Sequence, residues 1–154
     1  MISVVPARAD KDLRQAKILF EEYAATLDFA LDFQNFEGEL AGLPGSYAPP
    51  EGCLLLALTR DQVAGCVALR KIDPDICEMK RLFVRPSFRH LGIGKALAQS
   101  VIQEAKKKGY TRMRLDTVPS MKEARALYGS LGFEPIPSYC HNPIPGAVFL
   151  ELEL

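Results

Sequence analysis

The chain has 154 residues, of which 48% are hydrophobic and 25% are charged, and these proportions are typical of a single globular domain, here expected over residues 1–154. Nineteen basic side chains balance nineteen acidic ones, which argues against a nucleic-acid partner, because such binders usually carry a basic excess. No apolar run is long enough for a membrane span, and the N-terminus lacks the pattern of a signal peptide. We therefore expect a cytoplasmic protein with no membrane partner.

The first part of the chain is predicted to contain one strand and two helices. Residues 2–7 form the strand, and Asp10 caps a helix whose apolar side chains recur at helical spacing. A second helix is expected over residues 32–41, because glycine and proline cluster at residues 42–45 and would end it.

The middle of the chain is predicted to form an antiparallel meander of strands 53–59, 63–71 and 76–84. A helix over residues 92–108 carries apolar side chains at intervals of four. The following strand, 111–117, is expected to lie parallel to strand 76–84, because a crossover through a helix is right-handed and returns the chain to the same sheet.

The last part is predicted to hold a short helix and two closing strands. Pro119 ends strand 111–117, and Ser120 and Glu123 read as a capping box for a helix that ends at Gly132. Residues 133–136 and 147–154 form the closing strands. The expected fold class is α/β (α+β, three-layer), with a mixed, mostly antiparallel central sheet of six to seven strands flanked by four helices.

Neither cysteines nor histidines are arranged as metal ligands. The four cysteines include no Cys-x-x-Cys pair, and the two histidines are far apart, so no metal site is predicted. Cys53, Cys66 and Cys77 lie in apolar strand-like stretches, which predicts buried free thiols. Cys77 and Cys140 have no neighbouring base identifiable in the sequence, which disfavours a covalent intermediate.

The loop at residues 89–94 carries Arg89-x-x-Gly92-x-Gly94 between the central strand and helix. Two glycines at a helix start let a ligand approach the backbone, and the free amides there favour an anion such as a pyrophosphate. The alternative is a glycine-containing connection with no ligand. A dinucleotide fingerprint needs glycine where Leu97 stands, and a P-loop needs glycine where Arg89 stands, so both fit poorly.

This loop, following an apolar strand, resembles the acetyl-CoA loop of the GNAT N-acetyltransferase superfamily. A second stretch is similar to another signature of that family, Ala124-x-x-Leu127-Tyr128-x-x-Leu131-Gly132-Phe133. The resemblance extends from about residue 2 to the end, in the family's order of elements. It implies the GNAT-type acyl-CoA N-acyltransferase fold and an acetyl-CoA-dependent N-acetyltransferase. Such an enzyme moves an acetyl group to an amine acceptor through a ternary complex, with acetyl-CoA as co-substrate.

The same resemblance assigns residues to the cofactor. Backbone amides of Leu82, Phe83 and Val84 would bind the pantetheine arm and polarise the acyl oxygen. The pyrophosphate would be held by the loop and the first helical turn, namely Arg89, His90, Leu91, Gly92, Ile93, Gly94 and Lys95. Ser120 stands where many members of the family have asparagine, and its alternative role is only to cap the helix.

Tyr128 matches the tyrosine that protonates the CoA sulfur in this family. A phenol suits that task, because it keeps its proton near neutral pH and can pass it to a strongly basic thiolate. From periodicity alone, Tyr128 is instead a core aromatic on the apolar face of its helix.

Glu78 is the candidate general base. It lies eleven residues before Arg89, where some GNAT proteins carry a glutamate that acts directly or through water. A carboxylate on a mostly buried strand is costly unless it has a partner or a function. Alternation places Glu78 on one face with Lys80, Leu82 and Val84, so a structural Glu78–Lys80 pair is the alternative.

The acceptor remains open between a small-molecule and a peptide amine. The first two helices usually flank the acceptor site in GNAT proteins, so Phe29 and Phe33 are predicted to line it; the alternative is a hydrophobic cap over the core. Lys80 and Arg81 are predicted to hold a substrate carboxylate, whereas acidic residues near Phe29 would instead attract a cationic amine.

Other hypotheses also remain open. A non-catalytic acyl-CoA-binding or partner-binding module would keep the same fold, although Tyr128 favours catalysis, because a sensor needs no proton donor beside the sulfur. Transfer of a longer acyl chain is possible with the same loop. The closing strand 147–154 would permit a homodimer.

Overall fold

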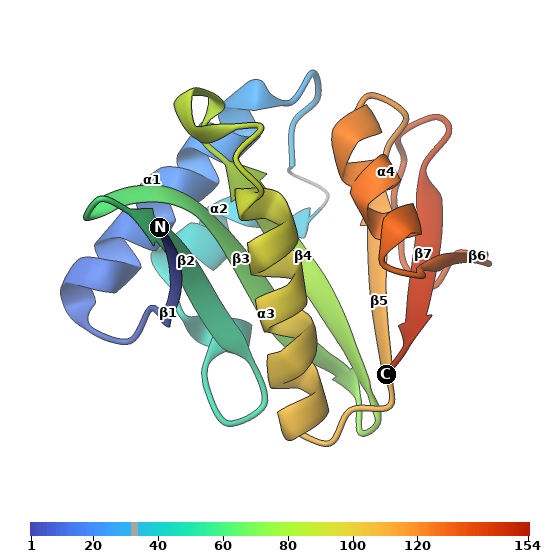
Figure 1. Ribbon diagram of the computed structural model, residues 1–154. Helices are drawn as coiled ribbons and strands as arrows, with labels where there is room; N and C mark the ends of the chain where they lie inside the picture. Colours follow the sequence, from blue (N-terminus) through green and yellow to red (C-terminus); the bar gives the residue numbers. More distant parts are fainter. Residues whose placement is uncertain (32–33) are drawn as a thin grey trace.

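Seven strands form one mixed sheet, ordered β1-β2-β3-β4-β5-β7-β6, in a computed structural model that describes residues 1–31 and 34–154 (Figure 1). The strands are β1 (Ile2–Pro6), β2 (Cys53–Thr59), β3 (Gln62–Asp73), β4 (Ile76–Val84), β5 (Arg112–Thr117), β6 (Glu134–Ile136) and β7 (Val148–Glu153). Every neighbouring pair is antiparallel except β4 and β5, which are parallel. The predicted meander, the parallel pair and the mostly antiparallel sheet are therefore confirmed.

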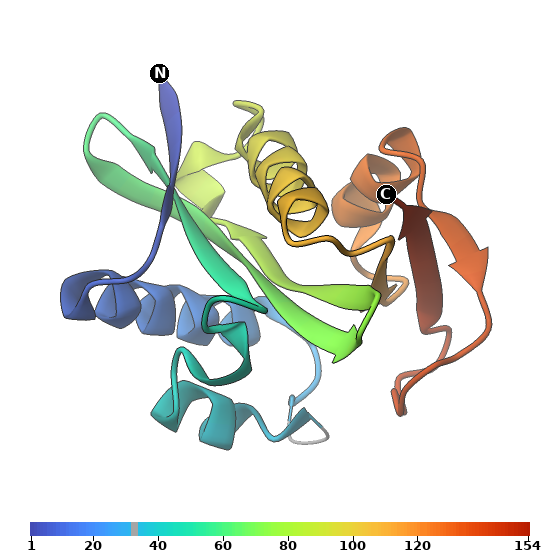
Figure 2. The ribbon, with the colours of Figure 1, turned by 90° about the horizontal axis from the view of Figure 1, so that it is seen from below.

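Helices cover both faces of this sheet. Helices α1 (Asp10–Thr26) and α2 (Phe36–Ala41) lie on one face, and α3 (Ile93–Lys107) and α4 (Lys122–Ser130) on the other (Figure 2). One-turn 3-10 helices lie at Gly45–Tyr47 and Pro86–Phe88. The three layers follow, because a sheet with two apolar faces must bury both. In the described part of the chain, no helix is long and apolar enough to cross a membrane.

The apolar residues of β2 contribute to two separate hydrophobic cores. Leu54 belongs to a cluster with Leu19 and Phe20 of α1, whereas Leu55 belongs to a cluster with Leu97 and Val101 of α3. Alternate residues of a strand point to opposite faces, so a strand between two helical layers is apolar throughout. This arrangement explains why the sequence of β2 does not alternate.

A β-bulge interrupts β4 at Arg81. This residue has a left-handed φ of +60°, and the β3–β4 register shifts between Cys66 and Ala68. Gly65 lies against the bulge, and a Cβ at this position would collide with the carbonyl oxygen of Phe83. A bulge adds a residue to one strand and bends it, and glycine at the facing position allows the close approach of the two backbones.

The bulge reverses the predicted faces of the end of β4. Met79 belongs to the α3-side core, so its neighbours Glu78 and Lys80 point to the α1 side. Beyond the bulge, Leu82 and Val84 pack against the α3-side core. The prediction that these four polar and apolar residues share one face is therefore wrong, because the extra residue changes the alternation between Lys80 and Leu82.

β4 and β5 are paired only at their beginnings. The parallel pairing covers three residue pairs and ends at Glu78 and Arg114, although β4 continues to Val84 and β5 to Thr117. Figure 1 shows the two strands diverging toward the end where α3 begins. The two strands are therefore separate beyond Glu78 and Arg114.

Two predicted helix starts in the N-terminal part are wrong. The N-cap of α1 is Ala9, and Asp10 is the first helical residue; the Asp12 carboxylate accepts a hydrogen bond from the Ala9 amide at 3.4 Å. α2 begins at Phe36 instead of residue 32, because its N-cap Asn35 adopts a left-handed φ of +53°, which is incompatible with a continuous helix. Residues 32–33 lie outside the described residues.

The predicted capping box of the last helix is also wrong. The Met121 amide donates to the Val118 carbonyl at 3.0 Å, which closes a turn around Pro119 and Ser120. Helix α4 consequently starts at Lys122 with Met121 as its N-cap and no side-chain cap. The turn leaves Ser120 outside the helix and exposed.

Gly65→Ala is expected to lower the free energy of unfolding by about 1–3 kcal/mol, because the added methyl group overpacks the β3–β4 bulge. Gly129→Ala is the matched control: a Cβ there meets nothing within 4 Å, and Gly129 is helical. The control should be neutral or stabilising by up to about 1 kcal/mol. Urea unfolding measures both, and equal effects of the two changes would contradict the role given to Gly65.

Candidate functional site

A cleft of about 940 Å³ lies where β4 and β5 separate. Its walls come from the end of α1, the end of β4, the start of α3 and the first turns of α4. β4 has lost its neighbour on this side, so the backbone edge of Leu82–Val84 faces the cleft instead of another strand. The cleft thus combines an unpaired strand edge with a helix N-terminus.

The first turn of α3 offers free amides. The Ala96 amide donates to the Gly92 carbonyl at 3.1 Å, so the amides of Ile93, Gly94 and Lys95 have no partner within the helix. The positive end of the helix dipole strengthens the attraction of these amides for an anion. Gly92 has a φ of +82°, which glycine adopts at little cost. This corner suits a phosphate group.

Most of the predicted cofactor residues meet in the cleft. Those that line it are Leu82, Phe83, Val84, Arg89, His90, Ile93, Gly94 and Ser120. Leu91, Gly92 and Lys95 belong to the same loop and helical turn but do not line it. The Arg89 Nε donates to the Val84 carbonyl at 3.3 Å, so its guanidinium lies along the end of β4.

Tyr128 lies beside this cleft in a second, smaller cavity of about 50 Å³. The two cavities share Tyr23, Leu82, Met121 and Ala124, so they adjoin. Burial raises the pKa of the Tyr128 phenol well above its usual value, and the phenol therefore stays protonated at neutral pH. Among the described residues, no side chain or carbonyl receives a hydrogen bond from its hydroxyl.

Glu78 is buried and held by two partners. Its carboxylate accepts a hydrogen bond from Arg70 Nε at 2.6 Å and another from the Tyr139 hydroxyl at 2.6 Å. The sequence analysis gave a structural ion pair between Glu78 and Lys80 as the alternative. The ion pair exists, but its cation is Arg70, because Arg70 on the adjacent strand β3 lies opposite Glu78 in the register. The two hydrogen bonds nevertheless hold the carboxylate in a fixed orientation.

A second carboxylate, Asp116 of β5, was given no role by the sequence analysis. One of its oxygens, one Glu78 oxygen and the Cys140 Sγ all lie within 4.8 Å of one another. The Asn142 side-chain amide donates to Asp116 at 2.9 Å, and Asp116 lines the small cavity with Tyr128. The only signal for Asp116 in the sequence was its polar character on a strand, β5, whose residues on the α3 side are buried.

The residues from the β6–β7 loop were also missed. Tyr139 and Asn142 come from this proline-rich connection, and they bond to Glu78 and Asp116 respectively. The Arg114 guanidinium lies over the Tyr139 ring, 5.4 Å from its centroid. Nothing local in the sequence of a loop indicates which distant strand it will contact.

The side chains of Glu78, Asp116 and Cys140 are of types that can bind metals, but they fit a metal ion poorly. Arg70 and Tyr139 occupy one oxygen each of Glu78. Burial, and then the Asp116 charge, raise the pKa of the Cys140 thiol to about 11, whereas metal ligation requires a thiolate. The set therefore gives no support to a metal centre.

The predicted acceptor residues differ in their surroundings. Lys80, Arg81 and Phe29 all line the small cavity, whereas Phe33 lies outside the described residues. The Arg81 guanidinium is buried and forms two hydrogen bonds of 2.8 Å with Glu39, so its charge is already neutralised. The Lys80 Nζ donates to the Gln34 amide oxygen at 2.9 Å.

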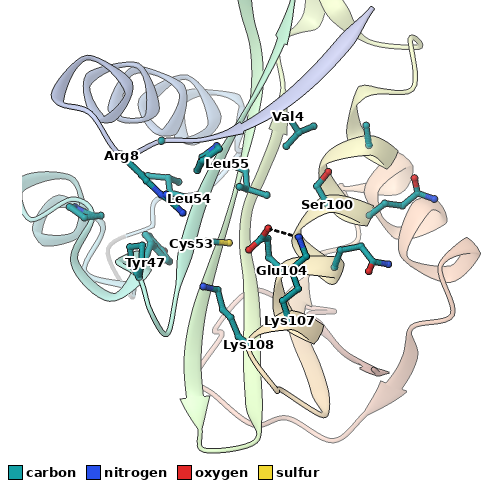
Figure 3. Close-up of a pocket in the computed structure, with 17 residues that line it drawn as sticks. Val4, Arg8, Tyr47, Cys53, Leu54, Leu55, Ser100, Glu104, Lys107 and Lys108 are labelled. Atoms are coloured by element: carbon teal, nitrogen blue, oxygen red, sulfur yellow. Dashed lines mark ion pairs between the residues drawn. The ribbon is translucent and has the colours of Figure 1, made fainter.

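A further cavity of about 460 Å³ lies on the other side of α3, away from this site (Figure 3). It is lined by Cys53 of β2 and by the second half of α3, including Lys107, which pairs with Glu104 at 3.6 Å. None of the loop residues 89–94 lines it. Burial raises the pKa of the Cys53 thiol to about 11, so this cysteine is not an activated nucleophile.

The chain is similar to known acetyltransferases. The sequence model described as "Acetyltransferase (GNAT) family" matches residues 15–133. An uncharacterized N-acetyltransferase of Schizosaccharomyces pombe is 41% identical, covering 99% of this chain and 95% of the relative. An N-acetylaspartate synthetase of Danio rerio is 33% identical, covering 75% of this chain and 42% of the synthetase.

A solved structure shows the same fold. The PaiA N-acetyltransferase of Thermoplasma acidophilum, in complex with coenzyme A, superposes with a TM-score of 0.76 at 18% identity. The match covers 100% of this chain and 99% of the other.

The Cys140 thiol is expected to react slowly with Ellman's reagent at pH 7.5, because burial raises its pKa to about 11 and the thiolate is the reactive form. Its rate should rise about tenfold per pH unit up to about pH 10. The difference between the wild type and Cys140→Ser isolates this thiol from the other three. A rate that levels off near pH 8 would reveal an activated thiolate instead.

Proposed function

This chain belongs to the acetyltransferase (GNAT) family, and from this premise we propose that it transfers an acetyl group from acetyl-CoA to an amine while both substrates are bound. The observation that carries the proposal is the junction of the two cavities. A cleft that starts at the free amides of α3 leads to a small cavity containing a protonated phenol, Tyr128.

The cleft supports acetyl-CoA at two places. The amides of Ile93 to Lys95, with the helix dipole, bind the pyrophosphate, and Arg89 adds positive charge at the rim. The pantetheine arm contains amide groups, and it pairs with the free edge of β4 at Leu82–Val84 as an added strand would. Bound in this way, the thioester end points toward the small cavity and Tyr128.

Acetyl transfer then requires a nucleophile, a fixed carbonyl and a proton donor. The neutral amine nitrogen attacks the acetyl carbonyl carbon, and a C–N bond forms as the C–S bond breaks. Backbone amides at the β4 bulge stabilise the oxygen as negative charge develops. The Tyr128 hydroxyl donates its proton to the leaving sulfur. The products are the N-acetyl amide and free CoA thiol, and the proton that the amine nitrogen loses replaces the one that Tyr128 gave to the sulfur.

The incoming amine is an ammonium ion that must lose a proton, and Asp116 and Glu78 together provide the acceptor. Asp116 lines the cavity and contacts the amine, and Glu78 lies behind it, with oxygens within 4.8 Å. We propose that Glu78 acts as base through Asp116 or water, because Arg70 and Tyr139 fix its orientation. The raised thiol pKa of Cys140 supports direct transfer without an acetyl-cysteine.

The relatives support a small amine as acceptor. The Danio rerio protein is named for N-acetylaspartate, in which the acetylated amine belongs to an amino acid. The small volume of the cavity, about 50 Å³, agrees with an acceptor of that size. A non-catalytic acyl-CoA-binding module is the competing function, and the presence of Tyr128 at the cavity disfavours it.

Acetyl-CoA is expected to bind the wild type and to bind the Arg89→Ala, Gly92→Asp double variant at least about tenfold more weakly. The change removes a cation and places an anion beside the pyrophosphate. Titration calorimetry measures both affinities. Lys107→Ala, at the opposite end of α3, is the matched control and should bind normally. Equal affinities for all three proteins would place the nucleotide elsewhere.

Tyr128→Phe is expected to reduce kcat by about 10²–10⁴-fold, because the leaving thiolate loses its proton donor, while the Kd for acetyl-CoA stays within about twofold. Thiol release measured with a panel of amines reports kcat, and calorimetry reports Kd. Tyr110→Phe, whose hydroxyl bonds the Glu51 carbonyl, is the control. An unchanged kcat in Tyr128→Phe would leave this tyrosine as a core aromatic only. A wild type that binds acetyl-CoA but acetylates no amine would favour the binding module.

A further inference from the structure

The small cavity is lined by one lysine and one aspartate that form no ion pair within the described residues. The neighbouring charged groups are paired: Arg70 with Glu78, Arg81 with Glu39, and Arg114 with Glu151. In residues 1–31 and 34–154, by contrast, Lys80 has only the Gln34 amide as its hydrogen-bond partner, and Asp116 has only the Asn142 amide. Both line the same cavity as Tyr128.

These two charges face each other across the separated strands. The parallel register pairs Glu78 with Arg114, and two residues further along each strand are Lys80 and Asp116. Residues two apart point to the same face, so the register would bring these side chains together if the strands stayed paired. Because the strands part after Glu78, the two charges do not form an ion pair within 4 Å, and the space between them belongs to the cavity.

Neutral amide partners fix both groups without cancelling their charges. An ammonium group has three donors and Lys80 spends one on Gln34; a carboxylate has several acceptor sites and Asp116 uses one for Asn142. A half-buried charge without a counter-charge is costly, and a ligand of opposite charge removes that cost. The cavity therefore offers one cationic and one anionic position, held a short distance apart.

We propose that the acceptor is a small free amino acid, with its ammonium group at Asp116 and its carboxylate at Lys80. This proposal rests on the proposed function, since it names the substrate of the same site. It also orients the amino acid. The substrate nitrogen lies at Asp116, on the side of the cavity that holds the carboxylates of Asp116 and Glu78, and the substrate carboxylate is directed to Lys80 on β4. A peptide N-terminus or a polyamine would satisfy Asp116 but leave Lys80 without an anionic partner.

Binding and turnover test this proposal separately. The probes are the twenty free amino acids, each with its carboxamide and, where it exists, its decarboxylated amine. Saturation-transfer NMR on the protein saturated with CoA detects binding without catalysis. Thiol release from acetyl-CoA gives kcat/KM. At least one amino acid should bind, and its kcat/KM should exceed that of its own amide and amine by 10-fold or more.

The variants assign the carboxylate to one side chain. Lys80→Met should lower kcat/KM for the amino acid by about 10- to 100-fold and remove its advantage over the amide, while the affinity for acetyl-CoA stays within about twofold. Lys80→Gln serves as a second variant if methionine disturbs folding. Lys71→Met, an exposed lysine paired with Glu51, is the matched control and should behave as the wild type.

The outcomes separate this proposal from the proposed function. If amides or simple amines are acetylated as well as the amino acids, or if Lys80→Met keeps the preference, the amino-acid acceptor is overturned while acetyl transfer stands. If none of the twenty amino acids binds or reacts, the proposal is likewise overturned. Binding of an amino acid without any thiol release would instead keep the recognition site and overturn the proposed catalysis.

Discussion

The loss of pairing between β4 and β5 after Glu78 and Arg114 is the constraint on which the site depends. It frees one edge of β4, which would otherwise be occupied by backbone bonds, and it opens the cleft above that edge. The bulge at Arg81 follows three residues later and changes the direction of β4. The same separation keeps Lys80 and Asp116 apart, so one feature of the sheet creates both cavities.

Such a gap leaves polar groups without partners on a neighbouring strand. The C-terminal half of the chain supplies the missing partners. β7 pairs with the far edge of β5, and the loop before it returns to the gap. From this loop Tyr139 bonds Glu78, and Asn142 bonds Asp116. A buried carboxylate is tolerated only with such partners. The loop therefore fixes both carboxylates before any substrate arrives, which removes part of the ordering cost of binding.

The elements could largely be read from the sequence, whereas the contacts between distant ones could not. Apolar runs bounded by turn residues predicted the meander, and apolar side chains at intervals of four predicted α3. Two local motifs assigned Arg89, Gly92 and Tyr128 to the candidate site. The bulge at Arg81 was missed because its determinant, a glycine on the facing strand, is not adjacent in sequence. The partners of Glu78 were missed for the same reason: register and loop closure bring them together.

The charges of the site follow a single rule that only the structure reveals. Where strands stay paired, opposite charges meet and neutralise each other, as Arg70 and Glu78 do across β3 and β4. Where the strands part, Lys80 and Asp116 receive neutral amides instead. A direct ion pair would have been the simpler way to reduce the cost of burial. Its absence among the described residues would leave free energy available for a ligand that bears both charges, as the proposed amino-acid acceptor does.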